Sequence, residues 1–121
     1  MTAGSADLRA ELQRRGVSDV DDSVLTRALY SSDASLYRVV PQVVVRPRAI
    51  DELDAVLDVA SLTQVPITMR GAGTSIAGNA VGPGIVVDTV RHLNHVLSID
   101  PEARTAVVQP GLMNAQVKAA A

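Results

Sequence analysis

Apolar positions near the N-terminus recur at helical spacing. Leu8 and Leu12 stand one helical turn apart, Ser5 precedes them where a capping side chain is favoured, and Gly16 follows as a usual helix stop. We therefore expect a short, peripheral helix that begins at Ser5 and ends before Gly16.

A second helix is predicted over residues 24–29, because the capping sequence Asp-Asp-Ser at 21–23 comes directly before it. The polar segment 30–33 that follows is typical of a turn. Asp33 in this segment is interpreted as a turn or helix-cap residue in preference to one that approaches a substrate. Residues 1–37 are together interpreted as a helical lead-in.

The pattern then changes to strand, helix and strand. Residues 43–45 are a valine run framed by prolines, which is short enough for a buried strand. Apolar residues at three- and four-residue steps over 50–60 predict an amphipathic helix, and a second β-type run covers 65–69. The connections are short, so we expect a βαβ unit with parallel strands and a right-handed crossover.

The crossover helix carries four carboxylates, which raises the alternative of a metal or acid–base cluster. They occupy the positions that its apolar stripe leaves free, so we interpret them as its solvated face. The acidic residues are Asp51, Glu52, Asp54 and Asp58, and the apolar stripe is Ile50, Leu53, Val56, Leu57 and Ala60.

Three further β-type runs follow, over residues 84–87, 96–99 and 105–108. The turn sequence Asp-Pro-Glu-Ala at 100–103 predicts that the last two pair as a hairpin. A final helix begins at residue 114. The expected fold class is α+β, with a short parallel βαβ unit and helices, followed by antiparallel strands.

Composition narrows the function. The 121 residues are 47% hydrophobic but only 2% aromatic, so the core is built from Val, Leu, Ile and Ala, which suit buried parallel strands. The formal charge of −2 and the lack of a basic patch make nucleic acid an unfavoured partner. Without an apolar run of about 18 residues, we expect a cytoplasmic protein with no transmembrane segment.

The glycine-rich stretch at 70–80 superficially matches two phosphate-binding motifs. Gly73 and Gly78 have the spacing of a Walker A loop, but Asn79 stands where that loop needs lysine. In the Rossmann fingerprint Ile76 falls at the third glycine, where helix and strand must pack closely. Both motifs are therefore disfavoured.

The stretch nevertheless has the chemistry of an anion-binding nest. Its glycines let backbone N–H groups approach an anion, and Thr74 and Ser75 add hydroxyl donors. Two phosphates of a dinucleotide can be held in this way without a lysine, although a plain surface turn is the alternative. Arg70 has two equal interpretations, as a partner of phosphate or of a carboxylate such as Asp88.

At this point a resemblance to a known family becomes specific. Residues 41–111 resemble the first part of the FAD-binding domain of the vanillyl-alcohol oxidase and p-cresol methylhydroxylase family. The segments that carry the resemblance are Val-Val-Val-Arg-Pro at 43–47, Val-Pro-Ile at 65–67, Arg-Gly-Ala-Gly-Thr-Ser at 70–75 and Val-Val-Gln-Pro-Gly at 107–111. Residues 30–35 and 70–80 are most similar to bacterial D-lactate and glycolate dehydrogenase-like proteins, some of them fused to iron–sulfur modules.

The resemblance implies a set of FAD-binding residues. The backbone of the pyrophosphate loop is expected to contact FAD, with further residues near the flavin or alongside the cofactor. The residues whose backbone is expected to contact FAD are Gly71, Ala72, Gly73, Thr74 and Ser75, and the further residues are Gly78, Asn79, Gly111 and Pro41. Arg70, at the entrance of the loop, is also counted as a cofactor-binding residue.

Thr74 occupies the place where many relatives have a histidine that is bonded to the flavin ring. Because threonine does not form that bond, the resemblance implies noncovalent FAD. His92 and His95 lie outside the loop and are interpreted as surface or strand-end residues, not as metal ligands.

The function that the resemblance implies is oxidation of a D-2-hydroxy acid, such as lactate or glycolate, by an FAD-dependent enzyme. Residues 38–121 are then an incomplete FAD-binding domain, expected to be inactive without a substrate domain or an iron–sulfur subunit as partner. Two alternatives stay open: a noncatalytic remnant or half of a split flavoprotein, and an unrelated anion-binding α/β protein.

Overall fold

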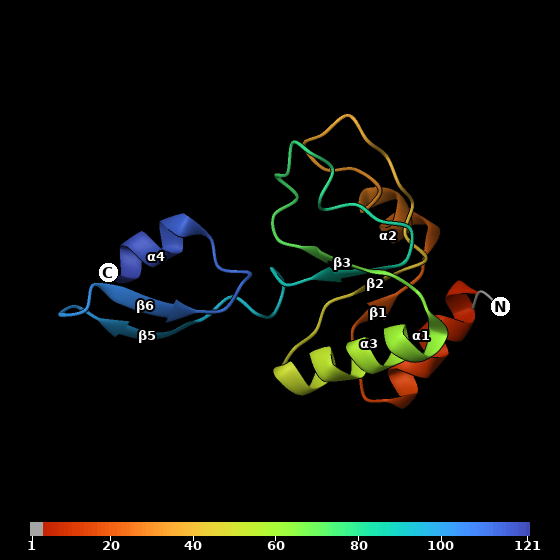
Figure 1. The fold of residues 1–121 in the computed structure, drawn as a ribbon, viewed down its shortest axis with the longest axis horizontal. Coiled ribbons are helices and arrows are strands. Elements are labelled where there is room, and N and C mark those ends of the chain that lie inside the picture. Colours follow the sequence, from red (N-terminus) through yellow and green to blue (C-terminus); the bar gives the residue numbers. More distant parts are fainter. Residues whose placement is uncertain (1–3) are drawn as a thin grey trace.

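A four-stranded sheet lies at the centre of the first part of the chain (Figure 1). The computed structural model describes residues 4–121. In spatial order the strands are β1 (Val20–Asp21), β2 (Val43–Val45), β4 (Ile85–Asp88) and β3 (Ile67–Arg70).

The predicted parallel relation of the two βαβ strands is confirmed, with a third strand between them. Both β2 and β3 pair in parallel with β4, which is the run predicted over residues 84–87. Strand β1 was not predicted, because two residues are too short to form a hydrophobic pattern. It pairs antiparallel with β2, so part of the predicted lead-in belongs to the sheet. The boundary between residues 1–37 and 38–121 stays a prediction.

Helices α1 (Ser5–Arg14) and α3 (Ile50–Thr63) lie side by side on one face of this sheet (Figure 1). Leu8 and Leu12 of α1 are both 0% exposed and pack in the same core cluster as Val56 of α3. The expectation of a peripheral first helix was therefore wrong. The predicted Ser5 cap was also wrong, because Gly4 holds the N-cap position and no side chain caps this helix.

The apolar stripe of α3 is narrower than the sequence pattern predicted. Val56 and Val59 are buried, whereas Ile50 and Leu57 are 65% and 57% exposed. Only the strip that faces the sheet and α1 is covered. The acidic residues of this helix lie outside that strip, as expected, and Glu52 accepts a hydrogen bond from the Ser18 N–H (3.3 Å).

Loops and a short helix occupy the opposite side of the sheet (Figure 1). Helix α2 (Val24–Leu29) begins where predicted, and the Ser23 side chain caps it by accepting from the Thr26 N–H (3.3 Å). The segment 31–39 and the glycine-rich loop lie on this same side. They approach each other although they are far apart in sequence.

The predicted hairpin forms from β5 (Val96–Asp100) and β6 (Thr105–Val108), which pair antiparallel. It lies beside α4 (Asn114–Ala120), apart from the four-stranded sheet (Figure 1). The expected α+β fold class is confirmed. Within residues 4–121 no helix has the length and apolar character needed to cross a bilayer, and the cytoplasmic location stays a prediction.

Candidate functional site

The glycine-rich loop is the connection between two parallel neighbours, β3 and β4. Residues 71–84 leave the carboxyl end of β3 and return to the amino end of β4. Parallel neighbours need a crossover of a dozen or more residues, usually helical. Here the crossover is irregular, so its backbone N–H groups are not committed to a helix.

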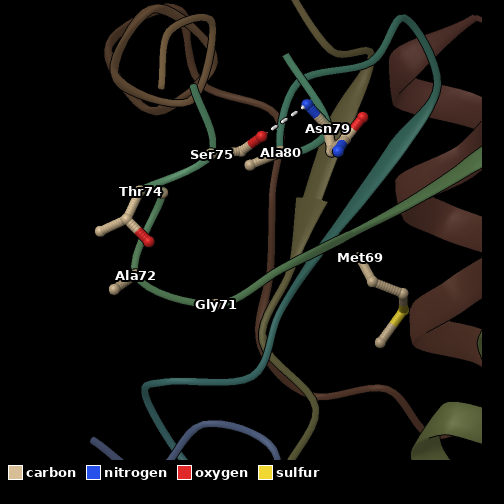
Figure 2. A pocket seen from close by; sticks show the side chains of 8 residues that line it. Met69, Gly71, Ala72, Thr74, Ser75, Asn79 and Ala80 are labelled. Carbon is tan, nitrogen blue, oxygen red and sulfur yellow. Dashed lines mark hydrogen bonds between the residues drawn. The ribbon is translucent and has the colours of Figure 1, made fainter. Parts of the chain in front are cut away.

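An open pocket of about 310 Å³ lies within this loop (Figure 2). Six of the predicted site residues line it together, and Met69 and Ala80 complete it. The predicted lining residues are Gly71, Ala72, Gly73, Thr74, Ser75 and Asn79. Met69 and Ala80 were missed because neither has a side chain with recognisable binding chemistry.

The backbone amides of residues 71–75 are the main hydrogen-bond donors of this pocket. Within residues 4–121 they donate to no protein acceptor. The Ser75 hydroxyl oxygen accepts from the Ala77 N–H (3.3 Å) and the Asn79 N–H (3.1 Å), and the second of these bonds is visible in Figure 2. A hydroxyl has one proton to donate as well as two lone pairs, so Ser75 still has a proton to offer to a ligand.

Two glycines are required by the shape of the loop. Gly73 has φ +71°, and a Cβ there would lie 2.6 Å from the Arg70 Nη2 atom. Gly78 has φ +79°, and a Cβ there would lie 2.7 Å from Cδ2 of Tyr37. Any other residue is strained at these φ values, so both positions need glycine.

The pocket fits a pyrophosphate group. Uncommitted N–H groups that converge in a turn form an anion-binding concavity, and glycine lets a ligand approach the backbone. At Gly71 a Cβ would meet nothing within 4 Å, so the space in front of the backbone is open. None of the lining side chains is titratable, which suits binding and leaves acid–base chemistry to other groups.

Segment 31–37 packs against the loop and makes two polar contacts with it and a third with Arg70, which directly precedes it. The Ala34 N–H donates to the Gly73 carbonyl oxygen (3.1 Å), and the Asp33 carboxylate accepts from the Ala80 N–H (3.2 Å). The Arg70 Nη1 atom donates to the carbonyl oxygen of Ser32 (2.9 Å). Sequence reasoning missed this role, because nothing in the local pattern says that residues so far apart meet.

Arg70 does not pair with Asp88, so that alternative was wrong. Its Nη1 atom donates to the carbonyl oxygens of Ser32 and Ala80, the second at 3.2 Å, and its guanidinium lies 5.0 Å from the centre of the Tyr30 ring. Asp88 instead accepts from the Tyr30 hydroxyl. The phosphate alternative for Arg70 is not tested by these contacts.

The interpretation of Asp33 as a turn residue is confirmed. Its carboxylate accepts from the Ser35 N–H (2.8 Å) and from the Ser35 hydroxyl. The pKa of Asp33 is held below its usual value, first by the Ser35 hydroxyl and then by backbone N–H groups, with a smaller effect of Arg70. The carboxylate is therefore charged where it meets the loop.

Four predicted residues lie outside the pocket lining. Gly78 is in the loop itself, and the Arg70 side chain is directed to the Ser32 carbonyl oxygen of segment 31–37. Pro41 is buried before β2, where its carbonyl oxygen accepts from Arg27 (2.8 Å). Gly111 packs against the Thr89 carbonyl, which a Cβ would meet at 1.9 Å. The Thr89 N–H donates to the Arg70 carbonyl oxygen (3.1 Å), so Gly111 lies near the start of the loop.

Both histidines have protein partners away from the loop. His92 Nε2 lies 2.9 Å from an Asp19 carboxylate oxygen, and His95 Nδ1 lies 2.9 Å from the Gln109 side-chain oxygen. Burial raises the pKa of Asp19, but hydrogen bonds from His92 and Arg46 outweigh it and leave that pKa lowered. His95 is exposed and lies directly before β5, as predicted, whereas His92 is partly buried and held by Asp19.

Comparison with known proteins assigns the class of the domain. The chain belongs to the FAD binding domain family, whose family model matches residues 41–121. The resemblance to the p-cresol methylhydroxylase type of domain is confirmed, and FAD is the cofactor of the family.

Among curated relatives, the glycolate oxidase subunit GlcD of Bacillus subtilis is 39% identical over 110 residues, which are 88% of this chain and 23% of that protein. The D-2-hydroxyglutarate dehydrogenase of Pseudomonas putida is 38% identical over 98 residues, which are 78% of this chain and 10% of that protein. The chain therefore spans less than a quarter of the length of these relatives.

Solved structures share the fold. An alkyldihydroxyacetonephosphate synthase superposes with a TM-score of 0.80 at 22% identity, over 98% of this chain and 25% of that one. A berberine bridge enzyme variant superposes with a TM-score of 0.76 at 26% identity, over 97% of this chain and 26% of that one. The sheet, the loop and the hairpin thus have the fold of about a quarter of each of these proteins.

Proposed function

We propose that this chain is the FAD-binding portion of a flavin-dependent oxidoreductase that oxidises a D-2-hydroxy acid such as lactate or glycolate. The proposal is supported by the family of the domain and by relatives named glycolate oxidase subunit and D-2-hydroxyglutarate dehydrogenase. FAD bound at the loop would supply the acceptor for the hydride that leaves the substrate carbon.

The observation that carries the proposal is that the amides of residues 71–75 donate to no acceptor in the described part of the chain. Their N–H groups hold the pyrophosphate as neutral donors, and the hydroxyls of Thr74 and Ser75 add to them. Asn79 borders the same pocket. Gly78, Gly111 and Pro41 are proposed to lie nearer the flavin or alongside the cofactor, as the resemblance implies.

FAD is proposed to be held noncovalently. Thr74 stands where relatives carry the linking histidine, and the chain has no cysteine. Its two histidines are engaged with Asp19 and Gln109. The loop therefore lacks a side chain that could form the bond to the flavin.

The groups that select the substrate and remove its proton are proposed to come from a substrate domain, and an iron–sulfur subunit is a further proposed partner. The pocket lining contains no titratable side chain, so it offers no general base. Residues 38–121 act in this proposal as the first part of the FAD-binding domain, with residues 1–37 as its lead-in.

A titration of the whole chain with FAD, followed by absorbance and calorimetry, tests the proposal. The wild-type chain should bind FAD, and Gly73→Val should lose binding because a branched side chain at φ +71° displaces the loop. Gly16→Val is the matched control. Gly16 also has a positive φ of +97°, but a Cβ there meets nothing within 4 Å.

The control should lose about 1–2 kcal/mol of stability from the left-handed backbone and keep its FAD affinity. The proposal fails if the wild-type chain binds ATP or phosphate tightly and FAD not at all. That result would mean that the loop binds anions in general and is not the site of FAD in this chain.

A further inference from the structure

We infer that Arg70 and Asp33 are positioning residues, which fix the pyrophosphate loop onto segment 31–37 and so hold its amides in the geometry that binds FAD. The inference rests on the proposed function of the loop. It assigns a role in the cofactor site to a segment in the lead-in of the chain, outside the matched residues 41–121.

The two side chains fix the loop to the segment from its two sides: one comes from the strand that enters the loop, and the other comes from the segment. Arg70 belongs to the strand that enters the loop, and its Nη1 atom reaches the carbonyl oxygens of Ser32 (2.9 Å) and Ala80 (3.2 Å). Asp33 belongs to the segment, and its carboxylate reaches the Ala80 N–H (3.2 Å). The N–H and the carbonyl oxygen of Ala80 are therefore both hydrogen-bonded, at the point where the loop turns back towards β4.

Hydrogen bonds close residues 31–39 into a loop of their own, which makes segment 31–37 a firm support. The Val39 N–H donates to the Ser31 carbonyl oxygen (2.9 Å), and the Ser31 hydroxyl donates to Ala28 of helix α2 (2.7 Å). The Asp33 carboxylate caps the turn inside it through the Ser35 N–H (2.8 Å). These hydrogen bonds together limit the motion of segment 31–37 relative to α2.

The glycine-rich loop fits this support closely. The Gly73 carbonyl oxygen accepts from the Ala34 N–H (3.1 Å), so the peptide in the middle of the nest is fastened to the segment. A Cβ at Gly73 would lie 2.6 Å from the Arg70 guanidinium, and one at Gly78 would lie 2.7 Å from the Tyr37 ring. Glycine at position 78 lets the loop come within contact distance of the segment, and glycine at position 73 leaves room for the Arg70 guanidinium.

The donor geometry explains why arginine is needed. A planar guanidinium can donate to two carbonyl oxygens while its face lies against an aromatic ring, whereas a lysine ammonium is a single point of charge. Arg70 does this over the Tyr30 ring, 5.0 Å from its centre. Arg46 lies over the same ring at 5.5 Å but pairs with Asp19 (3.1 Å), and within residues 4–121 its side chain makes no hydrogen bond to the loop.

Arg70→Lys and Asp33→Asn test the inference, with Arg46→Lys as the matched control. In the whole chain without FAD, hydrogen exchange of the Asn79, Ala80 and Ala34 amides should become faster in both test variants and stay unchanged in the control. The dissociation constant for FAD should rise about tenfold in the test variants, the effect of one hydrogen bond. The double variant should lose less than the product of the two effects, because both residues hold one loop.

Salt dependence separates positioning from direct contact with phosphate. If Arg70 positions the loop, Arg70→Gln weakens FAD binding by a similar factor at low and high ionic strength, relative to wild type. If Arg70 binds phosphate, the loss shrinks as salt screens the charge, and Arg70→Lys keeps most of the affinity. That second pattern would overturn the inference, as would unchanged amide exchange in both test variants.

The exchange measurement needs no cofactor, so it decides the inference even for a chain that binds no FAD. Failure of the wild-type chain to bind FAD counts against the proposed function alone. If Arg70→Lys does not fold, Asp33→Asn alone decides, because it keeps the shape of the side chain and removes one of its two acceptor oxygens.

Discussion

Tyr30 joins several charged groups at the carboxyl ends of the parallel strands. Its ring lies within cation–π distance of Arg46 and Arg70, and its hydroxyl donates to Asp88. Burial raises the pKa of Tyr30, and the hydrogen bond to Asp88 raises it further. The neutral phenol is thus the form that the folded protein stabilises.

The sign of this shift predicts behaviour at high pH. Because the pKa of Tyr30 is higher in the folded chain, its contribution is fully present below the unfolded value, about 10, and is lost as pH rises through the folded value. Urea unfolding across this range should show a steeper loss of stability for wild type than for Tyr30→Phe. At neutral pH, Tyr30→Phe should cost about 1 kcal/mol. Parallel pH curves for the two proteins would contradict this assignment.

At the scale of elements, α1 shows how tertiary packing overrides a local reading. Its apolar pair at Leu8 and Leu12 is too small to indicate whether the helix lies on the surface or in the core. Both leucines are buried against the sheet and α3, so α1 forms part of the hydrophobic core.

A pair of leucine substitutions measures this difference. Leu12→Ala should destabilise the chain by about 2–5 kcal/mol, because it opens a cavity in the core. Leu25→Ala in α2 should change stability by less than about 0.5 kcal/mol, because Leu25 is 70% exposed. Chemical denaturation of both variants gives the comparison, and equal effects would place α1 outside the cooperative core.

The strands, helices and nest were predictable because each has a local cause. The valine run, the helical spacing over residues 50–60 and the glycine spacing depend on neighbours in sequence. Strand β1 and the support under the loop depend on partners elsewhere: Val20 pairs with Val45, and Asp33 meets Ala80. The order of β4 between β2 and β3 likewise follows from three-dimensional pairing, which one sequence does not show.

At the scale of the whole molecule, the β5–β6 hairpin leaves apolar side chains exposed to solvent. Leu97 of β5 is 61% exposed and Val107 of β6 is 56% exposed. Each strand pairs only with the other, so each has a free edge within residues 4–121. Free edges with apolar side chains favour pairing between chains.

We therefore expect self-association that increases with concentration in sedimentation velocity experiments. Leu97→Lys should reduce it by placing a charge on the hairpin. Leu25→Lys is the matched control, because Leu25 is similarly exposed but belongs to helix α2. A compact monomer at high concentration, for the wild-type chain, would count against this expectation.

The crossover between β3 and β4 has a thermodynamic consequence. A chain that folds must close residues 71–84 before β4 can take its place between β2 and β3, and that closure costs conformational entropy. A ligand held by this crossover binds only the chain in which it is closed. Saturation at a hundred times the dissociation constant would add about 2.7 kcal/mol to the free energy of unfolding. The cofactor would then protect the central strands from proteolysis as well as serving chemistry.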